Sequence, residues 1–187
     1  SCLSTFYFRN MTETFQTNHI QNHIIFLTKE ELTEFIERDN DTYIASFSKD
    51  DLQIRNSRSV HDYKNTIQHS FCSVEQSIQD KISKCISKIE NQNEKMTEKD
   101  IWDIDYQKFM QIPWKIGCTC DAKYENGFPH TREDIIILPA DKIQSMQEYD
   151  LCKLLIHEKI HVYQRLYSTE IENNLKKRGF QIVGTRK

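Results

Sequence analysis

The chain has 187 residues, of which 25 are basic and 28 are acidic, and a formal net charge of −3. This length predicts a single domain, residues 1–187, that buries about 70% of the surface its unfolded chain would expose. The sequence contains no basic tract and no apolar run near the ~20 residues of a membrane span. Neither a nucleic acid nor a membrane is therefore an expected partner.

The cysteines bear on the redox state of the chain. None of the six belongs to a Cys-x-x-Cys pair, and a chain of this length does not need disulfides to fold. We therefore expect reduced thiols and an intracellular protein. Two Asn-x-Thr triplets, at Asn10 and Asn40, leave a secreted protein as the alternative. The cysteines are Cys2, Cys72, Cys85, Cys118, Cys120 and Cys152.

The N-terminal half is expected to be mainly helical. Thr28 and Glu31 form the capping pattern that opens a helix, and Ser48 with Asp51 has the residue types to open another. The clearest helix follows Ser73, where apolar residues recur at spacings of three and four, as on the buried side of an amphipathic helix. These apolar residues are Val74, Ile78, Ile82, Cys85, Ile86 and Ile89.

A polar stretch from Asn91 to Asp100 separates this half from the C-terminal half. It is rich in Asn, Gln, Glu and Lys, which is typical of a linker. We expect it to connect a helical part, residues 1–93, to a second part, residues 100–187, that combines a sheet with a helix.

The second part begins with strand signals. The segment Trp114–Cys120 alternates in the manner of a strand, and Asp134–Pro139 is a short apolar run of β-branched character. Between them, Glu125-Asn126-Gly127 is a strong turn signal. The sequence therefore predicts a small sheet ahead of the C-terminal helices.

The segment from Leu151 to Arg165 carries the clearest chemical motif. His157 and His161 stand four residues apart, with Glu158 after the first, on an apolar run without Pro or Gly. On a helix, positions i and i+4 share one face, so the two imidazoles can hold one ion while the carboxylate lies beside it. Zinc in such a His-Glu-x-x-His pattern activates water and polarises a carbonyl, and the carboxylate acts as general base.

These residues resemble the zincin superfamily of metallopeptidases, over the motif helix and the segment before it. Lys159 departs from the uncharged residue that zincins usually carry there. The Pro-His-Thr trio at residues 129–131 and the Gln-Arg pair at residues 164–165 are also similar to a group of predicted zinc peptidases. In zincins a strand beside the active-site helix pairs with an extended substrate, and the resemblance implies this role for Ile135–Leu138 and the residues leading into this segment.

A zinc site needs a third protein ligand, and the sequence offers several. His130 precedes the motif, and an upstream third ligand in a similar topology is known from the peptide deformylase family. Glu170 and Glu172 follow the motif, where another zincin subclass places an acidic ligand. Cys118 and Cys120 are further candidates. If His130 is not a ligand, its place on the lip of the cleft suits it to donate to the oxyanion of a tetrahedral intermediate.

The residues after the motif have both structural and functional interpretations. Thr169 and Glu172 form a capping box for a C-terminal helix that Gly179 would close, which gives Glu172 a structural role instead of a metal-binding one. Gln164 and Arg165 continue the metal-facing side of the motif helix. There a side chain can orient a metal ligand, and an arginine can clamp a carboxylate. Alternatively, both residues form the polar end of an amphipathic helix.

Together these features predict an α+β, zincin-like domain with a helical N-terminal part, a small sheet and a metal-bearing helix. The expected function is zinc-dependent hydrolysis of peptide bonds in a peptide or protein substrate, with His157 and His161 binding Zn²⁺ and Glu158 as general base. Two alternatives stay open. A non-catalytic structural or interaction protein would lack an open coordination position, and a hydrolase of a small amide would have a closed pocket instead of an open groove.

Overall fold

A computed structural model describes residues 24–93 and 104–180, which form an α+β fold around one mixed sheet. The strand order is β1, β3, β5, β4, with β2 paired to the end of β3. Strands β1, β3 and β5 are parallel to one another, whereas β4 and β2 are antiparallel to their neighbours. The strands are β1 (Ile24–Phe26), β2 (Phe71–Cys72), β3 (Trp114–Thr119), β4 (His130–Arg132) and β5 (Ile135–Pro139).

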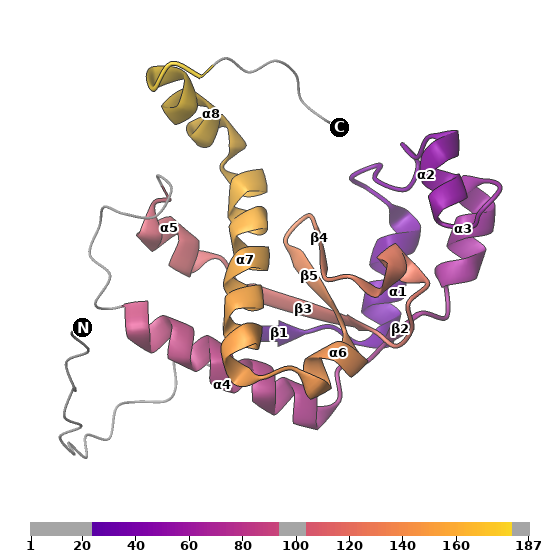
Figure 1. Cartoon of the computed structure of the whole chain (residues 1–187), viewed down its shortest axis with the longest axis horizontal. Helices are drawn as coiled ribbons and strands as arrows, with labels where there is room; N and C mark the ends of the chain where they lie inside the picture. Colours follow the sequence, from indigo (N-terminus) through magenta and orange to yellow (C-terminus); the bar gives the residue numbers. More distant parts are fainter. Residues whose placement is uncertain (1–23, 94–103, 181–187) are drawn as a thin grey trace, which may run out of the picture.

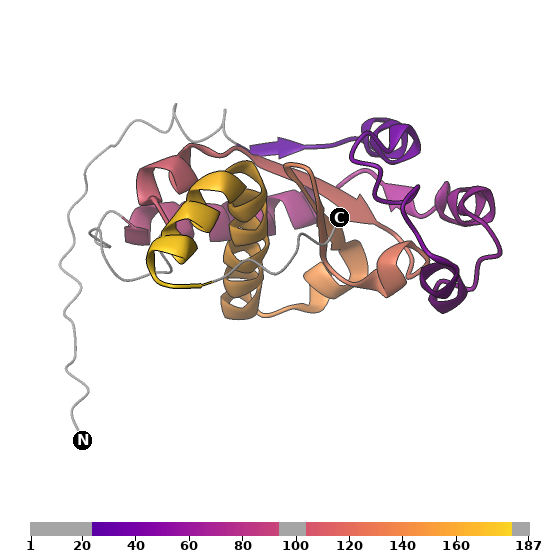
Figure 2. The ribbon, with the colours of Figure 1, turned by 90° about the horizontal axis from the view of Figure 1, so that it is seen from above.

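Two groups of helices cover the sheet (Figure 1). Helices α1, α2 and α3 pack over one face, and α4, α5, α6 and α7 over the other. Figure 2 shows α1–α3 at the end of the molecule away from α7 and α8. The helices are α1 (Lys29–Arg38), α2 (Lys49–Ile54), α3 (Val60–Ile67), α4 (Gln76–Asn93), α5 (Tyr106–Gln111), α6 (Ala140–Ser145), α7 (Glu148–Leu166) and α8 (Ser168–Lys177).

Side-chain alternation along β5 keeps two hydrophobic cores apart. Ile136 and Leu138 face the core beneath α4 and α7, whereas Ile135 and Ile137 face the core beneath α1 and α3. On β3, Gly117 lets α1 approach closely, because a Cβ at this position would lie 2.8 Å from Leu32 Cδ2. The sheet is therefore buried on both faces, as expected for a largely parallel sheet.

Both helix starts expected in the N-terminal half are confirmed. The Thr28 hydroxyl accepts from the backbone N–H of Glu31, and the Glu31 carboxylate accepts from the backbone N–H of Thr28. Ser48 caps α2 in the same reciprocal way with Asp51. The helix expected after Ser73 is α4, and its apolar stripe is buried. These caps depend only on residues three apart, so the sequence displays them directly.

The expectation that the first 93 residues are helical is only partly right. Strands β1 and β2 come from this part of the chain and pair with β3 from the other part. The two parts therefore share one sheet. Strands of three and two residues are too short to show a period of two, which explains why the sequence pattern did not reveal them.

The C-terminal helix, α8, ends as expected but begins differently from the prediction. Gly179 adopts a φ of 88°, and the N–H of Phe180 donates to the carbonyl of Leu175, as at a glycine-terminated helix. The expected capping box of Thr169 is wrong, because α8 begins at Ser168 directly after α7 and has no side-chain cap. The chain changes direction at Tyr167, which is both the C-cap residue of α7 and the N-cap residue of α8.

The five cysteines in the described ranges are free thiols, as expected, and Cys2 lies outside these ranges. Burial raises the pKa of the Cys118 thiol to about 12, so this thiol is protonated at neutral pH. Among the described helices, none is long and apolar enough to cross a membrane.

Lys159 is a charged residue inside the core beneath α7. Its side chain is 1% exposed, and its Nζ has no hydrogen-bond partner among the described residues. The Nζ lies 4.0 Å from the ring centroid of Trp114 and 5.0 Å from that of Phe109. Burial lowers its pKa to about 7, although Glu90 acts in the opposite direction. Aromatic faces compensate only part of the lost hydration of an ammonium group.

Replacing Lys159 with methionine should therefore stabilise the protein. At about pH 6, where the ammonium is charged, we expect Lys159→Met to raise the free energy of unfolding by about 1–2 kcal/mol, because an apolar chain of similar length removes the buried charge. Urea denaturation followed by circular dichroism measures this. Lys153→Met, on the exposed side of the same helix, is the matched control and should change little. A destabilised Lys159→Met would mean that the contact with Trp114 outweighs the cost of burial.

Candidate metal centre

Helix α7 presents two different sides. Leu151, Leu155 and Val162 are buried at helical spacing and fix the helix against the sheet and α4. His157 and His161 project from the exposed side. The apolar stripe therefore sets the rotation of the helix, and the two histidines face outward because they lie off that stripe.

The two imidazoles converge as the four-residue spacing predicts. Their Nε2 atoms lie 3.1 Å apart, and their ring centroids are 4.6 Å apart with the rings almost perpendicular. Two nitrogens that bind one tetrahedral zinc ion at about 2.0 Å are separated by about 3.3 Å. The His157–His161 pair is thus arranged as two ligands of a single ion would be.

Gln164 supports one of these imidazoles. Its Oε1 lies 3.3 Å from Nδ1 of His161, on the side of the ring opposite Nε2. When Nδ1 carries the proton and donates it to this oxygen, Nε2 keeps its lone pair for a ligand. This contact has the geometry predicted for Gln164 as a residue that orients a metal ligand.

Glu158 occupies the boundary between the exposed pair and the core. It is 6% exposed, although its two neighbours on the motif face are open to solvent. Burial raises the pKa of its carboxyl group, and His157 and His161 oppose this effect. No group in the described ranges donates a hydrogen bond to it. Glu158 is therefore a largely buried residue beside two imidazoles, and its carboxylate oxygens are not among the fully buried polar atoms of the described residues.

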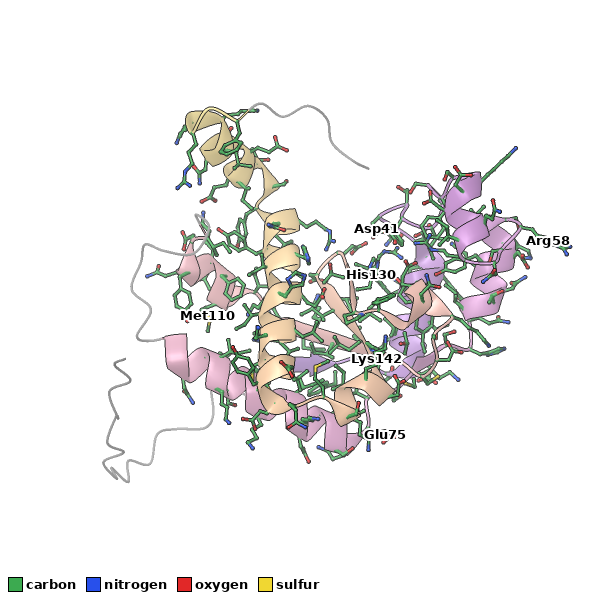
Figure 3. The ribbon with its side chains drawn as sticks, in the orientation of Figure 1. Asp41, Arg58, Glu75, Met110, His130 and Lys142 are labelled. Carbon is green, nitrogen blue, oxygen red and sulfur yellow. The ribbon has the colours of Figure 1, made fainter. Side chains whose placement is uncertain are left out.

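His130 does not join the pair. It opposes Ile137 in the β4–β5 ladder, and residues opposite each other share one face of a sheet. That face belongs to α1–α3, while His157 and His161 lie on α7 over the other face. The His130 ring instead lies 5.0 Å from that of Tyr43 and 5.9 Å from that of Tyr124, between centroids. Figure 3 shows it beside the loop that carries Asp41.

Three of the other suggested ligands are engaged elsewhere or buried, and the fourth, Glu172, lies half-buried on α8. Glu170 accepts a hydrogen bond from Lys108 of α5 at 2.5 Å. Cys118 is buried within β3, and the Cys120 thiol donates to the backbone carbonyl of Ser70. Within residues 24–93 and 104–180, no group of three or more His, Cys, Asp or Glu side chains is arranged to hold a metal ion. The described part of the chain therefore supplies two candidate ligands, not three.

Both β5, which contains Ile135–Leu138, and β4, which leads into it, contact α7, and β4 is the edge strand. That segment lies within β5, which has β3 on one side and β4 on the other and so is not an edge. The chain reverses immediately before it, at Glu133 with φ 48°, and this tight turn places β4 at the rim of the sheet. The sequence did not separate the edge strand from the inner one, because the three residues of β4 are too few to show a strand period.

Arg165 connects α7 to this edge strand. Its guanidinium donates to the carbonyl of Glu133 at 2.6 Å, to the hydroxyl of Thr131 at 3.2 Å and to the carbonyl of Thr131 at 3.4 Å. Thr131 opposes Ile136, so it faces α7 and not the α1 side. Arg165 thus touches the outer edge of β4, a contact that the helix pattern alone did not show.

A second polar cluster lies on the α1–α3 side of the sheet and was not foreseen. Arg55 donates to both oxygens of Glu125, at 2.6 and 3.2 Å, and the hydroxyls of Tyr43 and Tyr63 donate to the same carboxylate at 3.2 and 3.0 Å. Glu125 belongs to the predicted turn and has a φ of 47°. The turn was visible in the sequence, whereas its partners come from α2, α3 and the loop before them.

Comparison with known proteins identifies no similar protein. No family model matches the sequence, and no curated protein and no solved structure is significantly similar to the chain. The resemblance to zincins therefore rests on the motif residues themselves.

The environment of His130 predicts a pH-dependent stability. Burial lowers its pKa to about 4 in the folded protein, against about 6.5 in an unfolded chain. Between these pH values the unfolded state binds a proton that the folded state does not. The free energy of unfolding is therefore unaffected by His130 above about pH 6.5 and decreases as the pH falls towards 4. We expect wild type to lose about 2 kcal/mol more than His130→Phe between pH 7 and about pH 4.5.

Guanidinium denaturation at several pH values measures this difference. His69→Phe is the control, because His69 is exposed on a turn. Identical pH profiles for wild type and His130→Phe would show that the His130 imidazole remains protonatable in the folded protein.

Proposed function

We propose that this protein is a zincin-like, zinc-dependent peptidase. The observation that carries the proposal is the combination at one turn of α7: two outward imidazoles whose Nε2 atoms are 3.1 Å apart, and beside them the carboxylate of Glu158, which accepts no hydrogen bond from the described residues. A carboxylate that is not engaged in the fold can accept a proton from a molecule held at the imidazoles.

In the proposed mechanism, the residues on α7 have separate roles. His157 and His161 would hold the ion through Nε2, with Gln164 fixing the ring of His161. They are two of the three protein ligands that a zinc site needs, and no further His, Cys, Asp or Glu of the described residues completes the set. When bound, zinc supplies Lewis acidity to a carbonyl and lowers the pKa of a coordinated water. Glu158 would accept a proton and deliver it to the leaving amine; burial raises the pKa of its carboxyl group, which favours the first of these steps.

The edge strand supports a polypeptide substrate. β4 is at the rim of the sheet and contacts α7, the helix that carries the histidine pair. An extended peptide can add to such an edge as a further strand, with its backbone fixed by hydrogen bonds. This placement favours a peptide over a small amide, which would need an enclosing pocket.

Metal analysis and turnover test the proposal together. We expect purified protein to bind about one zinc ion per chain, and His157→Ala to lose it because one of the two imidazole ligands is gone. Glu158→Gln should keep the zinc and lose at least about 100-fold in turnover of unfolded peptides, because the amide cannot accept the proton. Inductively coupled plasma mass spectrometry and a fluorogenic peptide assay give the two readings.

His61→Ala, which removes an exposed histidine of α3, is the matched control and should alter neither reading. Undiminished zinc in His157→Ala would overturn the metal site. Undiminished turnover in Glu158→Gln would overturn the role of the carboxylate.

The contact between Gln164 and His161 predicts a smaller, separate effect. Gln164→Ala should weaken zinc binding about 10-fold or more without unfolding the protein, because the imidazole loses the acceptor that sets its orientation and tautomer. Competition with a chromogenic chelator measures the affinity. Gln144→Ala, at an exposed position of α6, is the control. Equal affinities of Gln164→Ala and wild type would mean that Gln164 does not orient the ligand.

A further inference from the structure

Arg165 has an unusual set of partners for a charged residue. Within the described ranges its guanidinium bonds only to neutral acceptors, the carbonyls of Thr131 and Glu133 and the hydroxyl of Thr131. Asp41 and Glu133 act on it at longer range, and Asp41 is already paired with Arg132. Arg165 is exposed, so a molecule arriving from solvent can reach it.

Its position is as informative as its partners. Arg165 follows His161 by four residues, so it lies one turn further along the same side of α7. Its partner carbonyls belong to the edge strand and to the turn directly after it. These are backbone acceptors that a peptide added along β4 would meet.

A peptide that pairs with β4 therefore has to compete with Arg165. The backbone N–H groups of an uncharged substrate would bind the carbonyls that the guanidinium now binds. Arg165 would then lose these acceptors without gaining a charged partner. A substrate with a carboxylate at this point gives Arg165 a two-point, charge-assisted partner, which is stronger than its present bonds to neutral oxygens. Such a substrate releases the carbonyls of β4 for its own backbone N–H groups.

We propose that Arg165 binds the free C-terminal carboxylate of the substrate, so that the protein removes residues from the C-terminal end of peptides. This inference rests on the proposed peptidase function. A helix rises about 1.5 Å per residue and an extended peptide about 3.3 Å, so the four residues from His161 to Arg165 span roughly two residues of substrate. Cleavage one or two residues from the C-terminus follows from this spacing.

The test uses zinc-loaded full-length protein and randomised octapeptides in two forms, with a free C-terminal acid or a C-terminal amide. We expect kcat/KM to be at least about 10-fold higher for the acid form, with loss of one or two C-terminal residues detected by mass spectrometry. Arg165→Met should lower the rate for the acid form to that for the amide form, and Arg165→Lys should keep part of the preference.

Arg58→Met is the matched control, because Arg58 is exposed at the far end of the molecule from α7 (Figure 3). It should leave the preference for the acid form unchanged. Equal rates for the two peptide forms, or cleavage at interior bonds, would overturn the inference and leave the peptidase function in place.

A binding experiment separates failure of the inference from failure of the function. Fluorescence anisotropy with labelled acid and amide octapeptides on Glu158→Gln measures docking without turnover. Suppose that wild type cleaves no peptide, but that Glu158→Gln binds the acid form at least about 10-fold more tightly than the amide form. If this difference disappears when Arg165 is also replaced, the carboxylate site is supported and the peptidase function is overturned. Equal binding of the two forms would overturn the carboxylate site whatever the turnover.

Discussion

The alternation of side chains along β4 and β5 is the constraint on which the candidate site depends. Because Thr131 opposes Ile136, it faces α7 and receives Arg165, while His130 and Arg132 oppose Ile137 and Ile135 and face α1. A shift of one residue in this pairing would exchange the two faces. It would bring His130 to the side of α7 and bury Thr131 beneath α1. The register of a three-residue strand thus decides which side chains can meet the motif.

Features that depend on neighbouring residues were visible in the sequence. The caps at Thr28 and Ser48 follow from spacings of three, and the convergence of His157 and His161 follows from helix geometry alone. The position of His130 needed a strand register, and the edge strand needed the order of the sheet. Neither is encoded locally, because both depend on pairing between segments whose order along the chain does not fix their order in the sheet.

The burial of Lys159 could in principle have been predicted from the sequence. It lies four residues after Leu155 and three before Val162, which places it on the buried stripe of α7 and not on the polar side. What the sequence could not show was the aromatic floor beneath it, since Trp114 and Phe109 come from β3 and α5. The network around Glu125 has the same origin: its turn is local, but Arg55 and Tyr63 arrive from other helices.

The two buried charges of α7 differ in a way that bears on function. The ammonium of Lys159 rests on aromatic rings, whereas Glu158 has nothing among the described residues to offset its burial except the two imidazoles. Hydrogen-bond donors would stabilise the carboxylate and lower its pKa, and with it the tendency to take a proton. Because Glu158 has no donors among the described residues, burial keeps the pKa of its carboxyl group raised. The apolar contacts of Leu151, Leu155 and Val162 hold the helix in place, so the position of Glu158 beside the histidine pair does not depend on hydrogen bonds to its carboxylate.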